Sequence, residues 1–413
     1  MYHRPAILRV PNEVLDLIFT ALAHDTATIL SLCMVSRSLL PIAQAVLFRR
    51  VDFAAVMQPL RCFPIWAGAV ATRSHLAHRV RVLCLRLPPT LGATDASKLA
   101  RALTACVNVK ELSLLTDYTN WRVDPSAFAA RTQSWKRFGG RKFQFQLVKF
   151  TNEYFEWDEN LRAFLSRQDS IQSLRLCEST TIGAVFGKGI EWTKNNDDVN
   201  APEARPLLPN LLTVSMDIKC LPPLRYSPRL ERIETTISGS FACRLGLGAY
   251  SSLTTLNVIW PSDTKGIGDL SEIIRAVAAL IPRLLHFTVR ETCININVHN
   301  LPCCVEPVET LSPFQQLASF ALVTKYLLFK RRNGRCFDTE EEKALAGECL
   351  RACLTLRHVT IECSRKCTYS ATRDEGGEVH ELVEREDKLE SLSEDKFESL
   401  SEDEFESLSW LSE

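Results

Sequence analysis

The sequence predicts a mixed α/β protein in three parts: short helices at the amino terminus, a long series of strands and helices, and an acidic tail. Helical apolar spacing in the first fifty residues, a recurring strand signature from about residue 76 to 361, and the acidity of the last forty residues predict this order. With 413 residues, 46% of them hydrophobic, the chain is large enough for an extensive core. The expected boundaries are 1–54, 55–372 and 373–413.

The first part has the start signals and the spacing of three short helices. Pro11 and Glu13 suit the first turn of the first helix. We expect Thr26 to cap a second helix and a third to begin near Ser38, with Pro41 in its first turn. Three such helices make a small core, so part of their apolar surface is expected to face another protein or domain. The apolar stripe of the first helix comprises Val14, Leu15, Ile18, Phe19 and Leu22.

Three sequence stretches carry a family resemblance. They are Val10-Pro11-Asn12-Glu13-Val14-Leu15, Leu32-Cys33-Met34-Val35-Ser36-Arg37, and Ala43-Gln44-x-x-Leu47-Phe48-Arg49-x-Val51. Together, over about residues 7–53, they resemble the F-box in the form common in large fungal families. Val10 replaces the usual leucine before the proline, and Leu47-Phe48 stands where many F-boxes have Leu-Trp. Both departures keep an apolar side chain at the position concerned.

The resemblance implies a role in protein degradation. F-box helices dock onto a Skp-type adaptor, which joins them to a cullin–RING ubiquitin ligase. The chain is thus expected to be a non-catalytic substrate receptor without a cofactor, in the cytoplasm, the nucleus or both, with a target protein that the sequence does not identify. The alternative is that the apolar stripe only packs on the following domain. By position, the adaptor-binding residues would be Val10, Pro11, Glu13, Val14, Ile18, Leu32, Val35, Ser36 and Leu39.

An apolar signature of the type L-x-x-L-x-L recurs through the second part. Its last two apolar positions are two residues apart and so point to one side of a strand. Several signatures follow a helix-like run that begins at an aspartate able to cap it, at Asp95, Asp158, Asp269 and Asp338. The signatures are Val80-Leu83-Leu85, Val109-Leu112-Leu114, Ile171-Leu174-Leu176, Leu211-Val214-Met216, Leu253-Leu256-Val258, Leu284-Phe287-Val289, Leu317-Phe320-Leu322 and Leu356-Val359-Ile361, with a weaker pair at Leu230 and Ile233.

Units of this kind bury their apolar side by stacking on one another, as in a leucine-rich-repeat solenoid. The spacing between signatures runs from 19 to 40 residues, with one interval of 62. We therefore predict an irregular leucine-rich-repeat-like solenoid with insertions near 117–160 and 178–207. An ordinary α/β domain with parallel strands is the alternative.

The longest insertion is basic and aromatic. No acidic residue occurs from Pro125 to Asn152, and Phe143 to Leu147 alternates like a half-buried strand. This predicts a surface for an acidic or phosphorylated degron, or for nucleic acid; the favoured alternative is a solvated loop with an edge strand. The acidic tail could also fold back here. The possible anionic-partner surface comprises Arg131, Lys136, Arg137, Arg141 and Lys142.

The tail gives the neutral chain a strong charge asymmetry. Residues 374–413 hold sixteen acidic residues against Arg385, Lys388 and Lys396, a net charge of 3 − 16 = −13, so the rest is near +13. An eight-residue repeat does not match the helical period, and with this charge density we expect mostly disorder.

Several classes of function and site are disfavoured. No apolar run approaches the roughly 18 residues of a membrane span, and HExxH, G-x-S-x-G and similar catalytic motifs do not occur. Fifteen cysteines without a secretory signal suggest reduced intracellular thiols. Cys349, Cys353, Cys363 and Cys367 lack zinc-knuckle spacing, so core packing is favoured over a metal site. A repeat scaffold acting outside a ligase and, less favoured, a nucleic-acid binder using 125–152 are the alternative functions.

Overall fold

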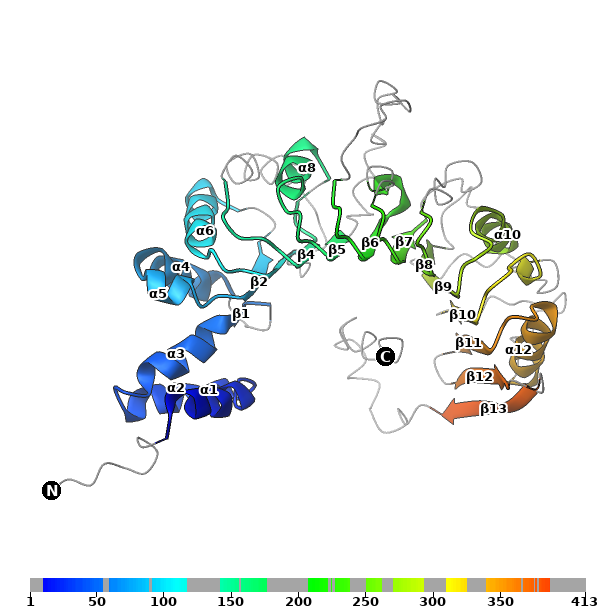
Figure 1. Cartoon of the computed structure of the whole chain (residues 1–413), viewed down its shortest axis with the longest axis horizontal. Helices are drawn as coiled ribbons and strands as arrows, with labels where there is room; N and C mark the ends of the chain where they lie inside the picture. The colour runs from blue at the N-terminus through cyan, green and yellow to red at the C-terminus, as the bar shows by residue number, and fades with distance from the viewer. Residues whose placement is uncertain are drawn as a thin grey trace. The chain divides into compact units, whose positions relative to one another are not determined.

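The structure is a computed structural model of a mixed α/β chain, as predicted (Figure 1). The chain divides into two compact units, Met1–Thr236 with Gly246–Leu253, and Ile237–Leu245 with Thr254–Glu413. The residues that the structure describes are 10–54, 59–88, 91–116, 142–155, 157–176, 207–221, 224, 227–237, 250–261, 270–292, 310–324, 339–364, 367–374, 376 and 379–386.

The three predicted amino-terminal helices are confirmed as α1 (Asn12–Ala21), α2 (Thr26–Val35) and α3 (Leu40–Arg49). Pro41 lies in the first turn of α3, where its missing N–H leaves no bond unmade. The expected cap of α2 was wrong by one residue. Asp25 caps it, because Thr26 already has helical geometry and the capping side chain must come from the residue before the first helical one.

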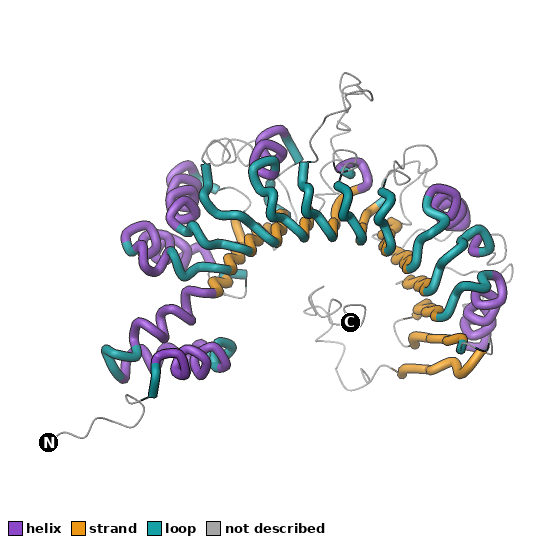
Figure 2. Tube along the Cα trace, viewed as in Figure 1, coloured by secondary structure: helices purple, strands orange, loops and turns teal. Residues whose placement is uncertain are grey.

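The strands of the first unit follow one another in chain order, and each pairs in parallel with the next. The helices of this unit that follow α3 lie along one side of these strands (Figure 2). The strands are β1 (Arg50–Asp52), β2 (Val82–Leu87), β3 (Glu111–Thr116), β4 (Lys149–Asn152), β5 (Ser173–Leu176), β6 (Thr213–Asp217) and β7 (Arg232–Thr236). The helices are α4 (Pro59–Thr72), α5 (Ser74–Ala77), α6 (Ala93–Ala105) and α8 (Glu159–Leu165), with a 3₁₀ turn, η3 (Ile218–Cys220), after β6.

The apolar signature explains which face of the sheet is buried. Every signature residue predicted from the sequence is buried, with exposed fractions of 8% or less. Alternate residues of β2 and β3 are buried and half-exposed, because successive side chains of a strand point to opposite faces. The buried face meets the helices, and the other face is left partly open.

Two strands of this unit were not predicted, β1 and β4. The β4 strand lies inside the presumed insertion 117–160, where Leu147, Phe150 and Asn152 occupy the signature positions with exposed fractions of 0%, 0% and 1%. Asn152 is stable in the core because Nδ2 donates to the carbonyl of Phe155 at 2.6 Å and Oδ1 accepts from its N–H at 3.0 Å. Residues 117–141 and 177–206, which hold most of the insertions, lie outside the described residues.

The second unit continues the same pattern and then reverses direction. Its strands β8 (Thr255–Pro261), β9 (His286–Thr292), β10 (Ser319–Thr324) and β11 (His358–Ser364) are parallel, with α10 (Leu270–Leu280) and α12 (Thr339–Ala352) in the connections. The last two, β12 (Cys367–Arg373) and β13 (Val379–Glu386), are antiparallel.

Part of the predicted acidic tail, 373–413, is a strand. Residues 379–386 form β13 and pair with the whole of β12, whose outer edge would otherwise have no backbone partners. Arg373 fixes this hairpin to α12, because its guanidinium donates to the carbonyls of Leu350, Cys353 and Leu354 at the end of that helix. Residues 387–413 lie outside the described residues.

The predicted aspartate caps have different outcomes. Asp158 caps α8, since its carboxylate accepts from the Leu161 N–H at 2.8 Å. Asp95 lies within the first turn of α6, and Gly92 precedes that helix. Asp269 and Asp338 fall outside the described residues.

Two of the four grouped cysteines pack in the core of the second unit. Cys349 and Cys353 are 1% and 2% exposed, and burial raises the pKa of the Cys349 thiol to about 12. These two thiols therefore behave as small apolar groups. The side chains of Cys363 and Cys367 are outside the described set. Within the described ranges, no helix combines the length and apolarity needed to span a membrane.

A candidate docking surface on the amino-terminal helices

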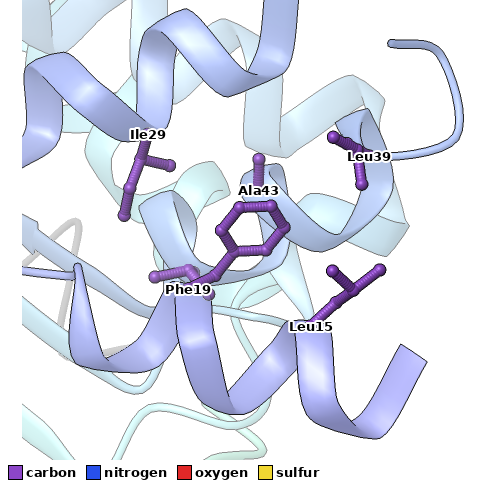
Figure 3. Close-up of a cluster of buried hydrophobic side chains, with 6 residues drawn as sticks. Leu15, Phe19, Ile29, Leu39 and Ala43 are labelled. Carbon is purple, nitrogen blue, oxygen red and sulfur yellow. The ribbon is translucent and has the colours of Figure 1, made fainter. Parts of the chain in front are cut away.

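The amino-terminal helices enclose a small apolar core of their own. Figure 3 shows side chains of α1, α2 and α3 pointing toward one another around the ring of Phe19. Phe19 and Ile29 are 1% and 0% exposed, so the centre of this core is dry. The buried members are Leu15, Phe19, Ile29, Leu39, Ala43 and Val46.

A second group of apolar side chains lies on the outside of the same helices. These six residues of α1 and α2 are between 43% and 88% exposed, the highest value belonging to Met34. We call them the docking surface: Val14, Leu17, Ile18, Leu30, Met34 and Val35. Single exposed apolar residues are ordinary on soluble proteins, but a group on two adjacent helices indicates an interaction site.

Helical spacing explains why α1 is apolar on two sides. Leu15 and Phe19 are four residues apart and share the inward face. Val14, Leu17 and Ile18 are related by the intervals of three and four that also define a single face, and all three are exposed. A helix that only packed on its own domain would need one such face.

Helix α2 has the same property in a stronger form, because none of its ten residues is charged. Ile29 points into the core, whereas Leu30 and Met34, four residues apart, are 52% and 88% exposed. A helix that is apolar around its circumference is normally buried on every side. The outer side of α2 is therefore apolar but is not packed against another part of the described residues.

The ends of α2 are held by local hydrogen bonds. Asp25 accepts from the backbone N–H of Thr28 at 3.0 Å and from its hydroxyl at 2.6 Å. The hydroxyl bond, followed by the backbone bond, lowers the pKa of the Asp25 carboxyl below its ordinary value. At the other end the carbonyl of Ser36 accepts from the N–H groups of Leu39 and Leu40, both at 3.1 Å. These bonds stabilise both ends of the helix that carries Leu30, Met34 and Val35 of the docking surface.

The structure separates the nine predicted adaptor-binding residues into three groups. Pro11, Glu13, Val14, Ile18 and Val35 are exposed. Val10 and Leu32 are partly buried against the core, and Ser36 is half-buried in the turn before α3. Leu39 is corrected: at 1% exposure it belongs to the core and offers no contact.

Sequence reasoning missed Leu17, Leu30 and Met34, which are more exposed than Val14 or Ile18. A signal for them was present in the uncharged sequence of α2 and in the position of Leu17 between the core residues Leu15 and Phe19, on the opposite side of the helix.

The predicted anionic-partner surface is described only at its end. Arg131, Lys136, Arg137 and Arg141 lie outside the described residues, and Lys142 is exposed. Residues 142–147 alternate in burial as predicted but form no strand. The Phe143 ring stacks on Phe145 at 5.1 Å and meets Phe164 of α8 edge-on at 6.1 Å, so these aromatic rings serve packing.

The open face of the first unit's sheet is a second surface of interest. It presents a row of residues in register across β2 to β7, with a hydroxyl of Ser215 donating to Glu234 at 2.8 Å. The row mixes polar and charged groups and includes one thiol, whose pKa is raised to about 12 by burial and by Asp52. Its members are Cys84, Ser113, Thr151, Arg175, Ser215 and Glu234.

Comparison of the chain with protein-family models and with curated proteins finds no match.

Proposed function

We propose that the chain is the substrate-recognition subunit of a Skp–cullin–F-box ubiquitin ligase. In this proposal the amino-terminal helices bind a Skp-type adaptor, and an irregular leucine-rich-repeat-like solenoid formed by the remaining strands and helices binds a target protein. The chain itself performs no bond chemistry and works in the cytoplasm, the nucleus or both. It acts by proximity, because a target held beside the charged enzyme reacts at a high effective concentration.

One observation carries the proposal: α1 and α2 have a complete inner core and, in addition, the exposed docking surface. The alternative reading, in which the apolar stripe only packs on the following domain, would require that domain to cover these residues. Leu17, Met34 and Val35 are instead 69%, 88% and 71% exposed. The F-box-like motifs of residues 7–53 occur in the same segment.

The energy of docking would come from apolar burial. Fully burying a side chain such as Leu, Ile or Met contributes about 1.5–3 kcal/mol. Several of these on one surface are enough for a stable complex after the cost of association is subtracted. The caps at Asp25 and Ser36 reduce that cost, since the helices need no ordering on binding.

The repeat-like part is supported by the parallel strands paired in chain order and by the burial of every signature residue. In such an array the same strand-and-helix unit is repeated. The face of the strands that is not covered by helices is available to bind another protein. We expect the target to use residues of this strand face, including the half-buried members of the row from Cys84 to Glu234.

The test is co-purification of the full chain with a Skp-type adaptor. Ile18→Asp and Met34→Asp each place a charge in the docking surface, so each should reduce recovery of adaptor and cullin at least about tenfold. The matched control is Leu354→Asp, an 85% exposed leucine in the second unit, which should not affect recovery. Unchanged thermal unfolding of all three variants shows that folding is intact.

Full adaptor binding by Ile18→Asp and Met34→Asp would refute this docking surface. If the wild-type chain fails to bind any Skp-type adaptor with purified components, the chain is instead a repeat scaffold that acts outside a ligase. The exposed apolar surface would then bind a different helical partner.

A further inference from the structure

Basic side chains gather at the amino-terminal ends of the first strands of the first unit's sheet. Arg49 ends α3, and Arg81 and Lys110 precede β2 and β3 by one residue. Lys149 is the first residue of β4. We call these four exposed residues, Arg49, Arg81, Lys110 and Lys149, the basic ladder.

Backbone hydrogen bonds place Arg49, Arg81 and Lys110 side by side and join Lys149 to the end of this row. The N–H of Arg81 donates to the carbonyl of Arg49 at 2.9 Å, and the N–H of Lys110 donates to that of Arg81 at 2.7 Å. The carbonyl of Lys110 in turn accepts from the N–H of Lys149 at 3.1 Å. Neighbouring parallel strands are about 4.8 Å apart, so Arg49, Arg81 and Lys110 follow one another along roughly 10 Å. Lys149 begins the next strand one residue further along the register, opposite Glu111.

The side chains extend along this edge. The Arg81 guanidinium donates to the carbonyl of Asn108 at 3.3 Å, and the Lys110 ammonium to that of Gln146 at 3.5 Å, each in the turn of the next strand. These long, exposed contacts use one donor of each group and leave the others directed to solvent.

The basic ladder has little internal compensation. None of its four residues forms an ion pair with a carboxylate among the described residues. Arg79, also exposed, adds charge to the turn before β2, whereas exposed Arg167 is accompanied by exposed Asp169. One acidic residue, Glu111, directly follows Lys110 in β3. It is half-buried and in register with Lys149. The edge is therefore a strip of excess positive charge.

We propose that the basic ladder binds an acidic, extended peptide segment of the target protein. The strip has cations about 4.8 Å apart on long side chains, which can reach carboxylates on one side of an extended chain that recur about every 6.7 Å. The ladder also begins at the last residue of α3, the helix that packs against α1 and α2. The inference rests on the proposed function in taking the peptide as part of a target.

Two features favour a peptide over nucleic acid. Single-stranded nucleic acids are bound by cations together with aromatic rings on which bases stack. Phe143 and Phe145 stack on each other, and Phe145 and Phe150 are 1% and 0% exposed, so these rings are used in packing. The full chain also has a net charge of zero, so it lacks the long-range attraction that basic nucleic-acid-binding proteins exert.

The experiment measures binding of a fluorescent dodecapeptide of alternating Glu and Ser to the full chain by anisotropy. The expected result is binding that weakens as salt is raised, because the Debye length falls from about 10 Å at 0.1 M salt to about 3 Å at 1 M. The Arg81→Glu/Lys110→Glu double variant should bind at least about tenfold more weakly. A dodecapeptide of Gln and Ser should not bind.

The control is Arg101→Glu/Arg283→Glu, which makes the same change in net charge at exposed positions of α6 and the second unit and should bind as the wild type does. Equal weakening by both double variants, or no binding of the acidic peptide, would overturn the proposal. Tighter binding of a single-stranded oligonucleotide than of the peptide, lost in the Arg81/Lys110 variant, would overturn it in favour of nucleic acid. Adaptor recovery by the Arg81/Lys110 variant is a separate readout, and it tests the ligase function alone.

Discussion

Ile18 and Phe19 are neighbours on α1, yet the first side chain is 45% exposed and the second 1% exposed. Ile18 therefore belongs to the docking surface, whereas Phe19 belongs to the internal core (Figure 3 shows Phe19 in this core). This division makes stability and partner binding separable by substitution.

Phe19→Ala is expected to lower the free energy of unfolding of the amino-terminal helices by about 3–5 kcal/mol, because it removes the ring at the centre of their core and leaves a cavity. Ile18→Ala should change it by less than about 0.5 kcal/mol, since the side chain is largely exposed. Hydrogen exchange of the α1–α3 amides distinguishes the two. Similar loss of protection in both variants would show that Ile18 is part of the core.

The Asp25 cap predicts a dependence of α2 on pH. Its carboxyl has a lower pKa in the folded chain than in the unfolded chain, because the ionised form accepts both bonds from Thr28. The stabilisation is thus complete above the ordinary Asp pKa of about 3.9 and is lost as pH falls through the lower folded value.

Asp25→Asn keeps an acceptor for the Thr28 N–H but cannot titrate, so the protection of the α2 amides should lose this part of its pH dependence. Asp25→Ala should lower protection at neutral pH as well, because no acceptor remains. Amide exchange of α2, measured at neutral pH and below about pH 3, is the readout. An identical pH profile for the wild type and Asp25→Asn would exclude the carboxylate as the cause.

The sequence predicted most of the parallel strands because period-two apolar triplets have few alternatives to a buried strand face. Leu256 and Phe287, for instance, were placed on strands and are 0% and 1% exposed. The β4 strand escaped notice because its last signature position is Asn152, whose polarity is compatible with the core only through the hydrogen bonds to Phe155. Such bonds depend on tertiary positions that a single sequence does not give.

The candidate docking surface was predicted less completely, for a related reason. Spacing identifies an apolar face but not which of two faces is turned inward. Leu39 was assigned to the surface and lies in the core, whereas Met34 was not assigned and is 88% exposed. Their placement depends on how α2 and α3 cross, which the turn at Ser36 determines.

Gln168 provides a test of how the first unit stabilises residues 142–147, which form no strand. Its side chain is 2% exposed, and its Oε1 accepts from the Leu147 N–H at 2.9 Å. Its Nε2 donates to the carbonyl of Phe145 at 3.3 Å. One amide therefore satisfies the backbone of a buried stretch that forms no strand, just before β4.

Gln168→Leu should reduce the free energy of unfolding of the first unit by about 1–3 kcal/mol, because the buried Leu147 N–H and Phe145 carbonyl would lose their partner. The matched control is Gln146→Leu, which makes the same change at an exposed position where the amide donates to the carbonyl of Arg167 at 3.0 Å. We expect a loss below about 0.5 kcal/mol for the control. Urea unfolding followed by tryptophan fluorescence measures both. Equal stability of the two variants would mean that water replaces the Gln168 amide and that this segment is hydrated.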